Sequence, residues 1–320
     1  MNQEIENVLK IFKEKPYSVR MGTSALIRQF KLNENAIKEA RKIYWLNEKK
    51  PKVIKQLSLG VPKPDLPKIL ILDIETAPLR AFVWSRWKQN IYLDQTISEW
   101  FMLTWSAKWL FSPEVISDKL TPDEAVSEDD ERITKRLWNI INEADIIVAH
   151  NGDRFDVPKI NTRFLLHGLP PTKPYKTVDT KVIAAKQFGF SSNKLDALAI
   201  YFGFDVKLDT DFELWVNCLK GDETSLMYME DYNRHDVELL EEVYLRLRPW
   251  IKGHPNLGLY METESPVCGN CGSDHLHEDR EYFTQVGRYK VYRCECGALS
   301  RVRTSNLSLK KKKNLLTNFK

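Results

Sequence analysis

A short apolar run that ends in two acids stands out in the first third of the chain. Residues 68–76, KILILDIET, contain five apolar side chains and carry Asp73 and Glu75. Such a run predicts a buried strand, whose successive side chains point to opposite faces, so both acids share one face. Two carboxylates this close repel each other unless a cation neutralises them, and we therefore expect a metal ion. The alternative is a solvated strand end, and the acids downstream decide between the two.

Beyond this run, strand-like and helix-like apolar periods alternate up to about residue 250. Residues 128–141 predict an amphipathic helix, and residues 145–149 predict a short buried strand. The segment of residues 231–250 has an apolar stripe at helical spacing and predicts a helix that Pro249 ends. This alternation is typical of an α/β domain.

The first 50 residues predict a small helical module. An apolar period over residues 5–12 indicates one helix. A short helix over residues 25–30, a tight connection over residues 31–33 and a longer helix around Ile37 have the form of a helix-turn-helix. The turn lacks its usual glycine, so two interpretations stay open: a DNA-contacting motif, or a helical module that packs or docks on protein.

Composition argues against a membrane protein, and the N-terminal residues lead us to expect no export. Hydrophobic residues make up 42% of the 320 residues, but no apolar run approaches the roughly 18 residues of a membrane span. The N-terminal MNQEIENVLK has acids where a secretory signal has a basic region and an apolar core. Four of the five cysteines lie in one short segment, which indicates metal binding in a reducing compartment. We therefore expect a soluble, cytoplasmic protein with no membrane partner.

Basic and aromatic residues gather in segments that suit a polyanionic partner. The net charge is only +4, but lysines crowd the proline-containing linker of residues 51–67, and Lys310–Lys313 crowd the tail of residues 304–320. Five of the nine tryptophans lie between Trp84 and Trp109. We expect core packing to explain most of them, and one or two near the acids to stack on bases.

Two later segments supply further candidate groups. Asp156 follows the strand of residues 145–149 in HNGDRFD, and ligands of open α/β sheets collect at the carboxyl ends of strands. Tyr232 and Asp236 are four residues apart, so they lie on one face of their helix. Each feature alone has a plainer interpretation: Asp156 as a helix N-cap, and Tyr232 with Asp236 as a pair at the rim of the core.

Together the three acidic segments resemble a known nuclease family. The DEDD exonuclease superfamily has three motifs, which match in order Asp73 and Glu75 in DIET, Asn151, Phe155 and Asp156 in HNGDRFD, and Tyr232 and Asp236 in YNRHD. The histidine variant of that superfamily would need histidine at the position of Asp231, so the pattern resembles the tyrosine variant, as in the proofreading domain of family B DNA polymerases. The resemblance covers residues 68–252 and implies a ribonuclease H-like mixed sheet flanked by helices.

The resemblance also implies a mechanism. Two divalent cations, Mg²⁺ or Mn²⁺, would be held by four carboxylates, namely Asp73, Glu75, Asp156 and Asp236. These four acids and Tyr232 would form the catalytic site. Tyr232 would orient the attacking water, because an ordinary tyrosine pKa near 10 suits positioning better than proton abstraction.

The C-terminal segment of residues 266–303 resembles a zinc ribbon. Four thiols form two close pairs across a hairpin-like stretch with Gly287 at its turn: Cys268, Cys271, Cys294 and Cys296. Tetrahedral Zn²⁺ would replace a hydrophobic core in a segment too short to build one, which makes this ion structural. The second pair is CxC, which leaves His275 or His277 as an alternative ligand. Cys218 has no such neighbour, and we expect it in the core.

These observations favour a metal-dependent 3′-to-5′ exonuclease of single-stranded DNA or frayed 3′ ends. An exoribonuclease is an alternative, because acids that act on a phosphodiester carry no information about the sugar. A nucleic-acid-binding regulator that keeps the nuclease fold as a scaffold is another, although the presence of all four acids argues for the enzyme. DNA is the partner we expect before RNA, and a protein partner would dock through the N-terminal module or the ribbon.

Overall fold

The computed structural model describes residues 3–14, 26–27, 30–47, 66–204 and 210–317. Most of the linker expected at residues 51–67 lies outside these ranges, as do parts of the expected helix-turn-helix. Within the described residues, no helix combines the length and the apolar composition that crossing a membrane requires.

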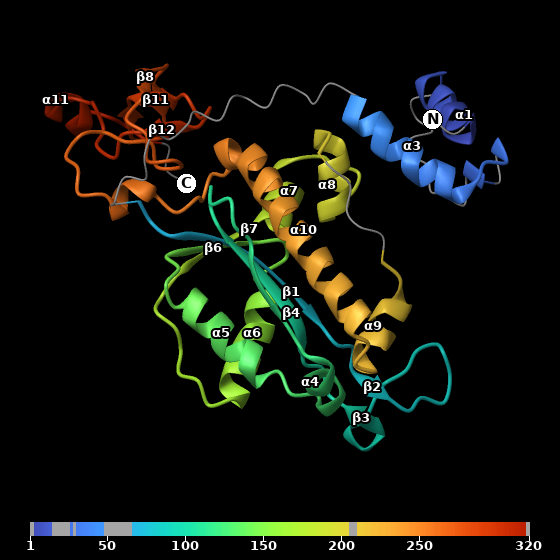
Figure 1. Cartoon of the computed structure of the whole chain (residues 1–320). Helices are drawn as coiled ribbons and strands as arrows, with labels where there is room; N and C mark the ends of the chain where they lie inside the picture. The colour runs from blue at the N-terminus through green and yellow to red at the C-terminus, as the bar shows by residue number, and fades with distance from the viewer. Residues whose placement is uncertain (1–2, 15–25, 28–29, 48–65, 205–209, 318–320) are drawn as a thin grey trace. The chain divides into compact units, whose positions relative to one another are not determined.

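A five-stranded mixed sheet organises the largest part of the chain (Figure 1). Its order is β5-β4-β1-β6-β7, which makes β1 the central strand, as the apolar run of residues 68–76 predicts. Strand β1 pairs antiparallel with β4 and parallel with β6, and β6 pairs parallel with β7. The bounds are β1 Ile69–Thr76, β4 Met102–Trp109, β5 Ile116–Lys119, β6 Ile146–Ala149 and β7 Lys176–Asp179. The predicted α/β class is confirmed.

Helices cover both faces of this sheet. Figure 1 shows α10 (Glu223–Leu247) along one face and the pair α5 (Glu131–Ile141) and α6 (Asp156–Leu166) on the other. The alternation along β1 decides which side chains meet which helices. Trp105 lies opposite Ile74 in the ladder and donates its indole N–H to the carbonyl of Ile133 in α5 (2.8 Å), so this face is apolar. The acids of β1 point the other way, under α10.

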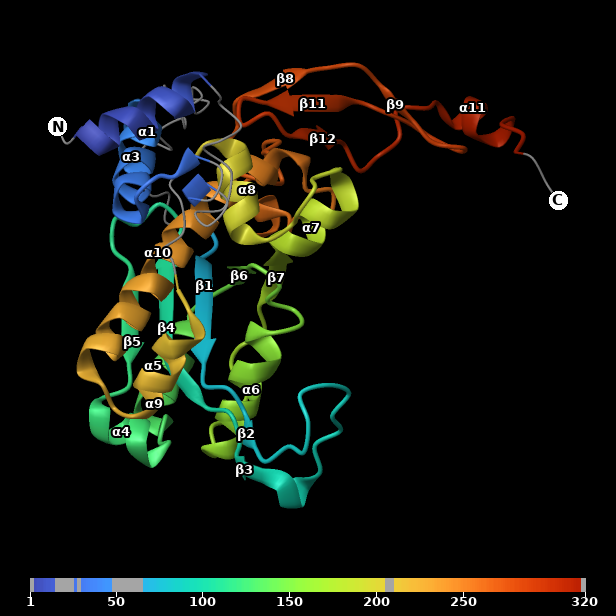
Figure 2. The same cartoon turned by 90° about the vertical axis from the view of Figure 1, so that its right-hand side faces the viewer.

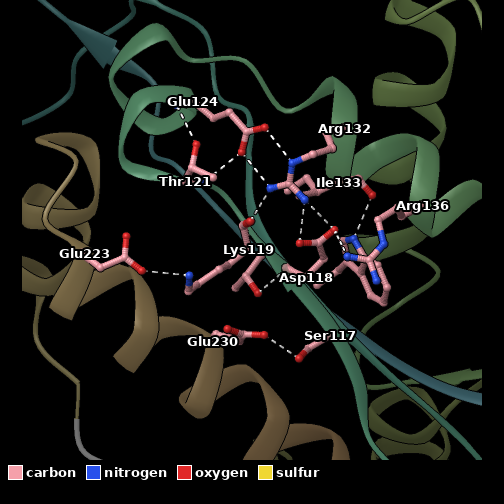
Figure 3. A network of polar contacts seen from close by, with 12 residues as sticks. Ser117, Asp118, Lys119, Thr121, Glu124, Arg132, Ile133, Arg136, Glu223 and Glu230 are labelled. Atoms are coloured by element: carbon pink, nitrogen blue, oxygen red, sulfur yellow. Dashed lines mark hydrogen bonds and ion pairs between the residues drawn. The ribbon is translucent and has the colours of Figure 1, made fainter.

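Polar contacts hold α10 in register on the sheet. Figure 3 shows Lys119 of β5 paired with Glu223 (3.2 Å) and the Ser117 hydroxyl donating to Glu230 (2.6 Å). Near the other end of the helix, Glu241 pairs with Lys108 of β4. Figure 3 also shows the Arg132 guanidinium of α5 joining Asp118 at the β5 edge to Glu124 of α4 (Pro122–Ser127). These contacts fix the height at which the middle of α10 passes over β1.

Two helices start at residues other than those that the sequence predicts. The helix expected over residues 128–141 begins at Glu131, because Glu128 ends a separate helix in a left-handed conformation (φ 60°). Helix α10 begins at Glu223, before the segment that signalled it, since the Asp222 side chain accepts from the Ser225 amide (2.7 Å) and caps it there. The first three residues of α10 are polar and the next four are all apolar, so the start of the helix shows no apolar period.

Shorter elements complete the sheet domain. They are β2 Arg80–Ala81, β3 Thr96–Ser98, α4 Pro122–Ser127, α7 Thr180–Gln187, α8 Leu195–Phe202 and α9 Phe212–Leu219, with single 3-10 turns at Leu93–Gln95, Arg248–Trp250 and Leu257–Tyr260.

The N-terminal unit has its own small core. Helices α1 (Gln3–Glu14) and α3 (Glu34–Asn47) contribute to a buried cluster of six residues, Val8, Phe12, Leu26, Ala36, Ile37 and Ala40. Lys31 takes the left-handed backbone (φ 53°) that a glycine usually supplies in such a connection. The Asn33 side chain then accepts from the Asn35 amide (2.9 Å) at the start of α3.

The C-terminal segment forms two small sheets rather than the one hairpin expected from the sequence. Strands β8 (Leu276–Glu278), β11 (Val291–Cys294) and β12 (Leu299–Arg301) make a three-stranded sheet, while β9 (Tyr282–Phe283) and β10 (Arg288–Tyr289) pair separately around Gly287. A Cβ at Gly287 would lie 2.4 Å from the Tyr289 hydroxyl, so the ring packs where only glycine leaves space. The lysine-rich tail holds a short helix, α11 (Leu309–Lys313).

Candidate functional site

Three of the predicted acids meet between the central strand and the helix above it. Asp73 and Glu75 project from the carboxyl end of β1, and Asp236 projects from the middle of α10. One carboxylate oxygen from each lies within 4.8 Å of the other two, in a group that could hold a metal ion. Asp236 is only 3% exposed, so its charge has little water to screen it. A divalent cation would relieve the repulsion, and hard oxygen donors are the ligands that Mg²⁺ and Mn²⁺ prefer.

Asn233 is a site residue that the sequence did not single out. Its side-chain amide donates to Asp73 Oδ2 at 2.6 Å, and the residue is fully buried. It precedes Asp236 by three residues, so both lie on the face of α10 that covers β1. The amide orients the Asp73 carboxylate. The three-residue spacing to Asp236 could have indicated Asn233 from the sequence, but only if the strand that faces this side of α10 had been known.

Tyr232 lies on α10 one turn before Asp236. The residue is 5% exposed and belongs to the same apolar cluster as Leu226 and Met229. Packing against this core leaves the ring few alternative rotamers, and a rigid ring is what positioning a water molecule requires.

Asp156 stands apart from the three-acid group. It is the first residue of α6, is 2% exposed, and accepts from the Ile74 amide through Oδ1 (3.2 Å). That amide is accessible to it because β6 pairs with β1 only as far as Ile71. Burial raises the Asp156 pKa to about 7, and the negative charge of Asp179 adds to the rise. The N-cap position expected as its plainer alternative belongs instead to Phe155.

Asp179 shapes the loop that presents Asp156, and sequence reasoning missed it. The residue ends β7 and accepts from the amides of Asn151 (3.1 Å) and Asp153 (3.4 Å). Asn151 adopts a left-handed backbone (φ 75°), which asparagine tolerates better than most residues. A Cβ at Gly152 would approach the Ala149 Cβ to 2.3 Å, so this tight turn needs glycine. The motif residues Asn151 and Gly152 therefore maintain the backbone conformation of the loop that precedes Asp156.

A cavity of about 490 Å³ opens beside the carboxyl end of β1. Its lining begins at Thr76, directly after Glu75, and includes Trp100, Lys159 and Trp215. The Lys159 ammonium lies 3.6 Å from the centre of the Trp100 ring and donates to the Thr76 hydroxyl (3.3 Å). Burial lowers its pKa. The lining holds one cation, Lys159, and one acid, Asp211, and its aromatic walls suit a flat ligand.

The four clustered cysteines form a second candidate metal site. Their sulfur atoms all lie within 4.8 Å of one another, with Cys268 and Cys296 separated by 3.8 Å and Cys271 and Cys294 by 3.5 Å. A zinc tetrahedron with Zn–S bonds of about 2.3 Å has S···S edges of about 3.8 Å, so the spacing fits the ion. Hydrogen bonds from its neighbours hold the Cys268 pKa low, while the pKa of Cys296 rises to about 12.

Neither alternative histidine belongs to this four-sulfur group. His275 instead faces Glu295, with Nδ1 3.1 Å from Oε2, and its side chain is largely exposed. Cys218 is buried in the main core, as predicted, and burial raises its pKa to about 12.

A reciprocal pair of hydrogen bonds ties the first cysteine loop to the sheet domain. Arg248 Nε donates to the Asn270 carbonyl (2.7 Å), and the Asn270 side-chain amide donates to the Arg248 carbonyl (2.8 Å). Asn270 lies between Cys268 and Cys271, and Arg248 directly follows α10. The thiol cluster is thus anchored at the end of the helix that carries Asp236.

A family model and a solved structure each match part of the chain. Residues 114–248 match the family model described as RNase_H superfamily, a stretch that includes Asp156 and Asp236 but begins after β1. The structure of the family B DNA polymerase from the hyperthermophilic archaeon Pyrobaculum calidifontis is similar, with 19% identity and a TM-score of 0.44. The match covers 60% of this chain and 25% of the polymerase chain, so this chain spans about a quarter of the polymerase's length. No curated protein matches the chain. The sheet order, the covering helices and the matched family together show that the chain contains a ribonuclease H-like domain.

Proposed function

We propose that the chain is a metal-dependent 3′-to-5′ exonuclease of the DEDD type, in its tyrosine variant, acting on single-stranded DNA and on 3′ ends. The observation that carries the proposal is the convergence of Asp73, Glu75 and Asp236 within 4.8 Å, from a strand and a helix far apart in the sequence. A ribonuclease H-like fold supports the nuclease class. The order of the motifs supports the direction of cleavage.

The donor set fits divalent cations. Asp73, Glu75 and Asp236 would hold them together with Asp156, whose raised pKa shows that burial opposes its charge until a cation compensates it. Such ions supply Lewis acidity and a nucleophilic water when bound. Asn233 keeps the Asp73 carboxylate in one orientation, so the site is preorganised.

Two further groups act on the substrate in this proposal. The Tyr232 hydroxyl orients the attacking water by a hydrogen bond. The cavity lined by Trp100 and Lys159 receives the terminal nucleotide, with the indole against the base and the ammonium near its phosphate. The first group serves chemistry and the second serves binding.

The cysteine segment contributes a structural zinc ion in this proposal. Four thiolates at tetrahedral spacing hold it, and its binding energy folds residues 266–303. Lys310–Lys313 then add cationic surface for a phosphate backbone. DNA is the proposed substrate, with an exoribonuclease and a non-catalytic nucleic-acid-binding regulator as alternatives for the test to separate.

The test compares 5′-labelled DNA and RNA oligonucleotides, single-stranded and duplex, with Mg²⁺ and with chelator. We expect a ladder of products shortened from the 3′ end on single-stranded DNA, slower trimming of RNA, and no products with chelator. Asp73→Asn, which keeps the size of the side chain, is the inactive control. Faster trimming of RNA than of DNA would identify an exoribonuclease. Binding of nucleic acid without cleavage in Mg²⁺ or Mn²⁺ would instead support the non-catalytic regulator.

A further inference from the structure

The tryptophans of β4 and of the segment that precedes it are of two kinds. Trp105 is fully buried in the sheet, whereas Trp84 is 95% exposed and Trp87 is 81% exposed. Both exposed indoles lie in the loop between β2 and β3, which we name the aromatic arm, residues 80–98. Large exposed aromatic side chains in one short segment mark a surface that something covers.

The arm starts beside the acid site. Strand β1 ends at Thr76 and β2 begins at Arg80, only a few residues later. Figure 2 shows β2, β3 and their connecting loop extending beyond the end of β1 toward which its arrow points. A strand of nucleic acid whose end lay at Asp73 and Glu75 would therefore pass close to the arm.

The base of the arm is held firmly. Strands β2 and β3 pair antiparallel, and the Phe82 amide donates to the Gln95 carbonyl (2.9 Å). Arg80 donates to the Ser98 hydroxyl (2.8 Å) and forms an ion pair with Glu128, which fastens the arm to the end of α4. The arm thus projects from a fixed stem.

The tip turns its tryptophans outward. The Gln89 side chain donates to the Ser85 hydroxyl (2.5 Å) and to the Trp87 carbonyl (2.6 Å), and Lys88 takes a left-handed backbone (φ 52°). These contacts close the turn through polar groups, so neither Trp84 nor Trp87 is needed to hold it together.

Charge indicates what covers the tip. Arg86 and Lys88 flank Trp87, and neither forms an ion pair with any residue that the structure describes. Along the arm, Asp94 is the only acid, against three basic residues. Aromatic rings between unpaired cations suit stacked bases and their phosphates, while a purely apolar protein surface would leave both cations without a partner.

We propose that the aromatic arm is a binding surface for single-stranded nucleic acid, with Trp84 and Trp87 stacking on bases several nucleotides from the cleaved end. This deepens the proposed function and rests on it, because the acid site supplies the end that enters first. The arm then sets how tightly long strands are held, and the acid site sets whether they are cut.

The experiment measures binding of a labelled 12-nucleotide oligothymidylate to the full-length protein in Ca²⁺. Replacing both indoles, Trp84→Ala with Trp87→Ala, should raise the Kd by at least about tenfold, because stacking on each base contributes roughly 1–3 kcal/mol, and 1.4 kcal/mol is tenfold. The conservative pair Trp84→Phe with Trp87→Phe should retain most of the affinity. Trp250→Ala, which removes an exposed tryptophan after α10, is the matched control and should bind within about twofold of wild type.

Acrylamide quenching of tryptophan emission tests the same proposal on the wild-type protein, without any substitution. Bound oligothymidylate should shield the exposed indoles, so acrylamide should quench less of the tryptophan emission. An unchanged Kd in the double alanine variant, with unchanged acrylamide quenching in wild type, would overturn the proposal and leave a protein as the partner of the arm.

The test also separates failure of the arm from failure of the proposed function. Hydrolysis of thymidine 5′-(p-nitrophenyl phosphate) by the wild-type protein in Mg²⁺ reports the acid site without a long strand. Hydrolysis together with an unchanged Kd in the arm variant rejects the arm alone. Shielded indoles and a raised Kd without any hydrolysis support the arm as a binding surface and reject the exonuclease.

Discussion

The two candidate metal sites differ in how the chain assembles them. The carboxylate site joins β1 to a helix about 160 residues later, and it lies on the large core of a five-stranded sheet. The thiol site joins cysteines 23 and 28 residues apart, and its own buried cluster contains little besides the cysteines and Ala298. At the first site the fold places the ligands. At the second we expect the ligands and their ion to hold the fold.

This contrast predicts opposite responses to loss of the metal. A sheet domain with a complete hydrophobic core should keep its structure without Mg²⁺, because burial of that core supplies its stability. A segment whose core is four sulfur atoms should lose its structure without zinc. Each site can be tested separately.

Loss of zinc should have the largest effect. Cys268→Ser should unfold residues 266–303 while leaving the sheet domain folded, because structural zinc contributes on the order of 10 kcal/mol to such segments. Zinc should co-purify at about one equivalent in wild type and in the control Cys218→Ala, which removes a thiol from the main core. Metal analysis and limited proteolysis measure both. Absence of zinc from protein purified without chelator would contradict the ribbon.

Loss of a carboxylate should remove activity and leave the fold. Asp236→Ala should lower cleavage by roughly 10⁴-fold or more, as removal of a central catalytic group does. Asp231→Ala removes an exposed acid from the same helix and should cleave like wild type. Single-turnover cleavage in Mg²⁺ with circular dichroism checks both variants. Robust cleavage by Asp236→Ala would reject the metal assignment.

Loss of the tyrosine hydroxyl should have an intermediate effect. Tyr232→Phe should lower kcat by roughly 10- to 1000-fold, comparable to removing one positioned hydrogen bond in the transition state, while the ring keeps its packing. Metal affinity, followed by Mn²⁺ titration, should change little. A wild-type rate would show that Tyr232 has only a structural role.

The smallest expected effect is on stability. Because burial raises the Asp156 pKa from 3.8 to about 7, this group favours the folded state fully only below about pH 3.8, and the contribution is lost as the pH rises to about 7. At pH 8 without Mg²⁺, Asp156→Asn should therefore raise the Tm by a few degrees, and at pH 4 the difference should nearly vanish.

The control for this effect is Asp153→Asn, an exposed acid in the same loop, which should leave the Tm unchanged at both pH values. Calorimetry at pH 4 and pH 8 measures all three proteins. A lower Tm for Asp156→Asn at pH 8 would mean that the ionised carboxylate is stabilised in the folded state.

Local pattern was sufficient where one element carries the information. The apolar run before Asp73 predicts the central strand and the common face of Asp73 and Glu75, since a strand alternates with a period of two. The two cysteine pairs likewise suggested their own cluster, because β8, which follows the first pair, lies beside β11, which ends at Cys294. Both predictions depend only on residues close in the chain.

Tertiary structure decided whatever depends on a facing element. Asn233 becomes a partner of Asp73 only because Glu223, Glu230 and Glu241 fix the height of α10 on the sheet. Asp156 binds the Ile74 amide, between Asp73 and Glu75 in the chain, because β6 stops pairing with β1 at Ile71 and leaves that amide accessible.

The tryptophans show the same division most simply. Within one stretch of sequence, the local pattern could not separate the buried Trp105 from the exposed Trp84 and Trp87. Burial depends on which strands pair and which helices cover them, and the β2–β3 hairpin pairs only with itself, outside the five-stranded sheet. The sequence by itself determined the elements and the kinds of chemistry they carry. Only the tertiary structure decided which side chains meet, because long-range packing sets their distances.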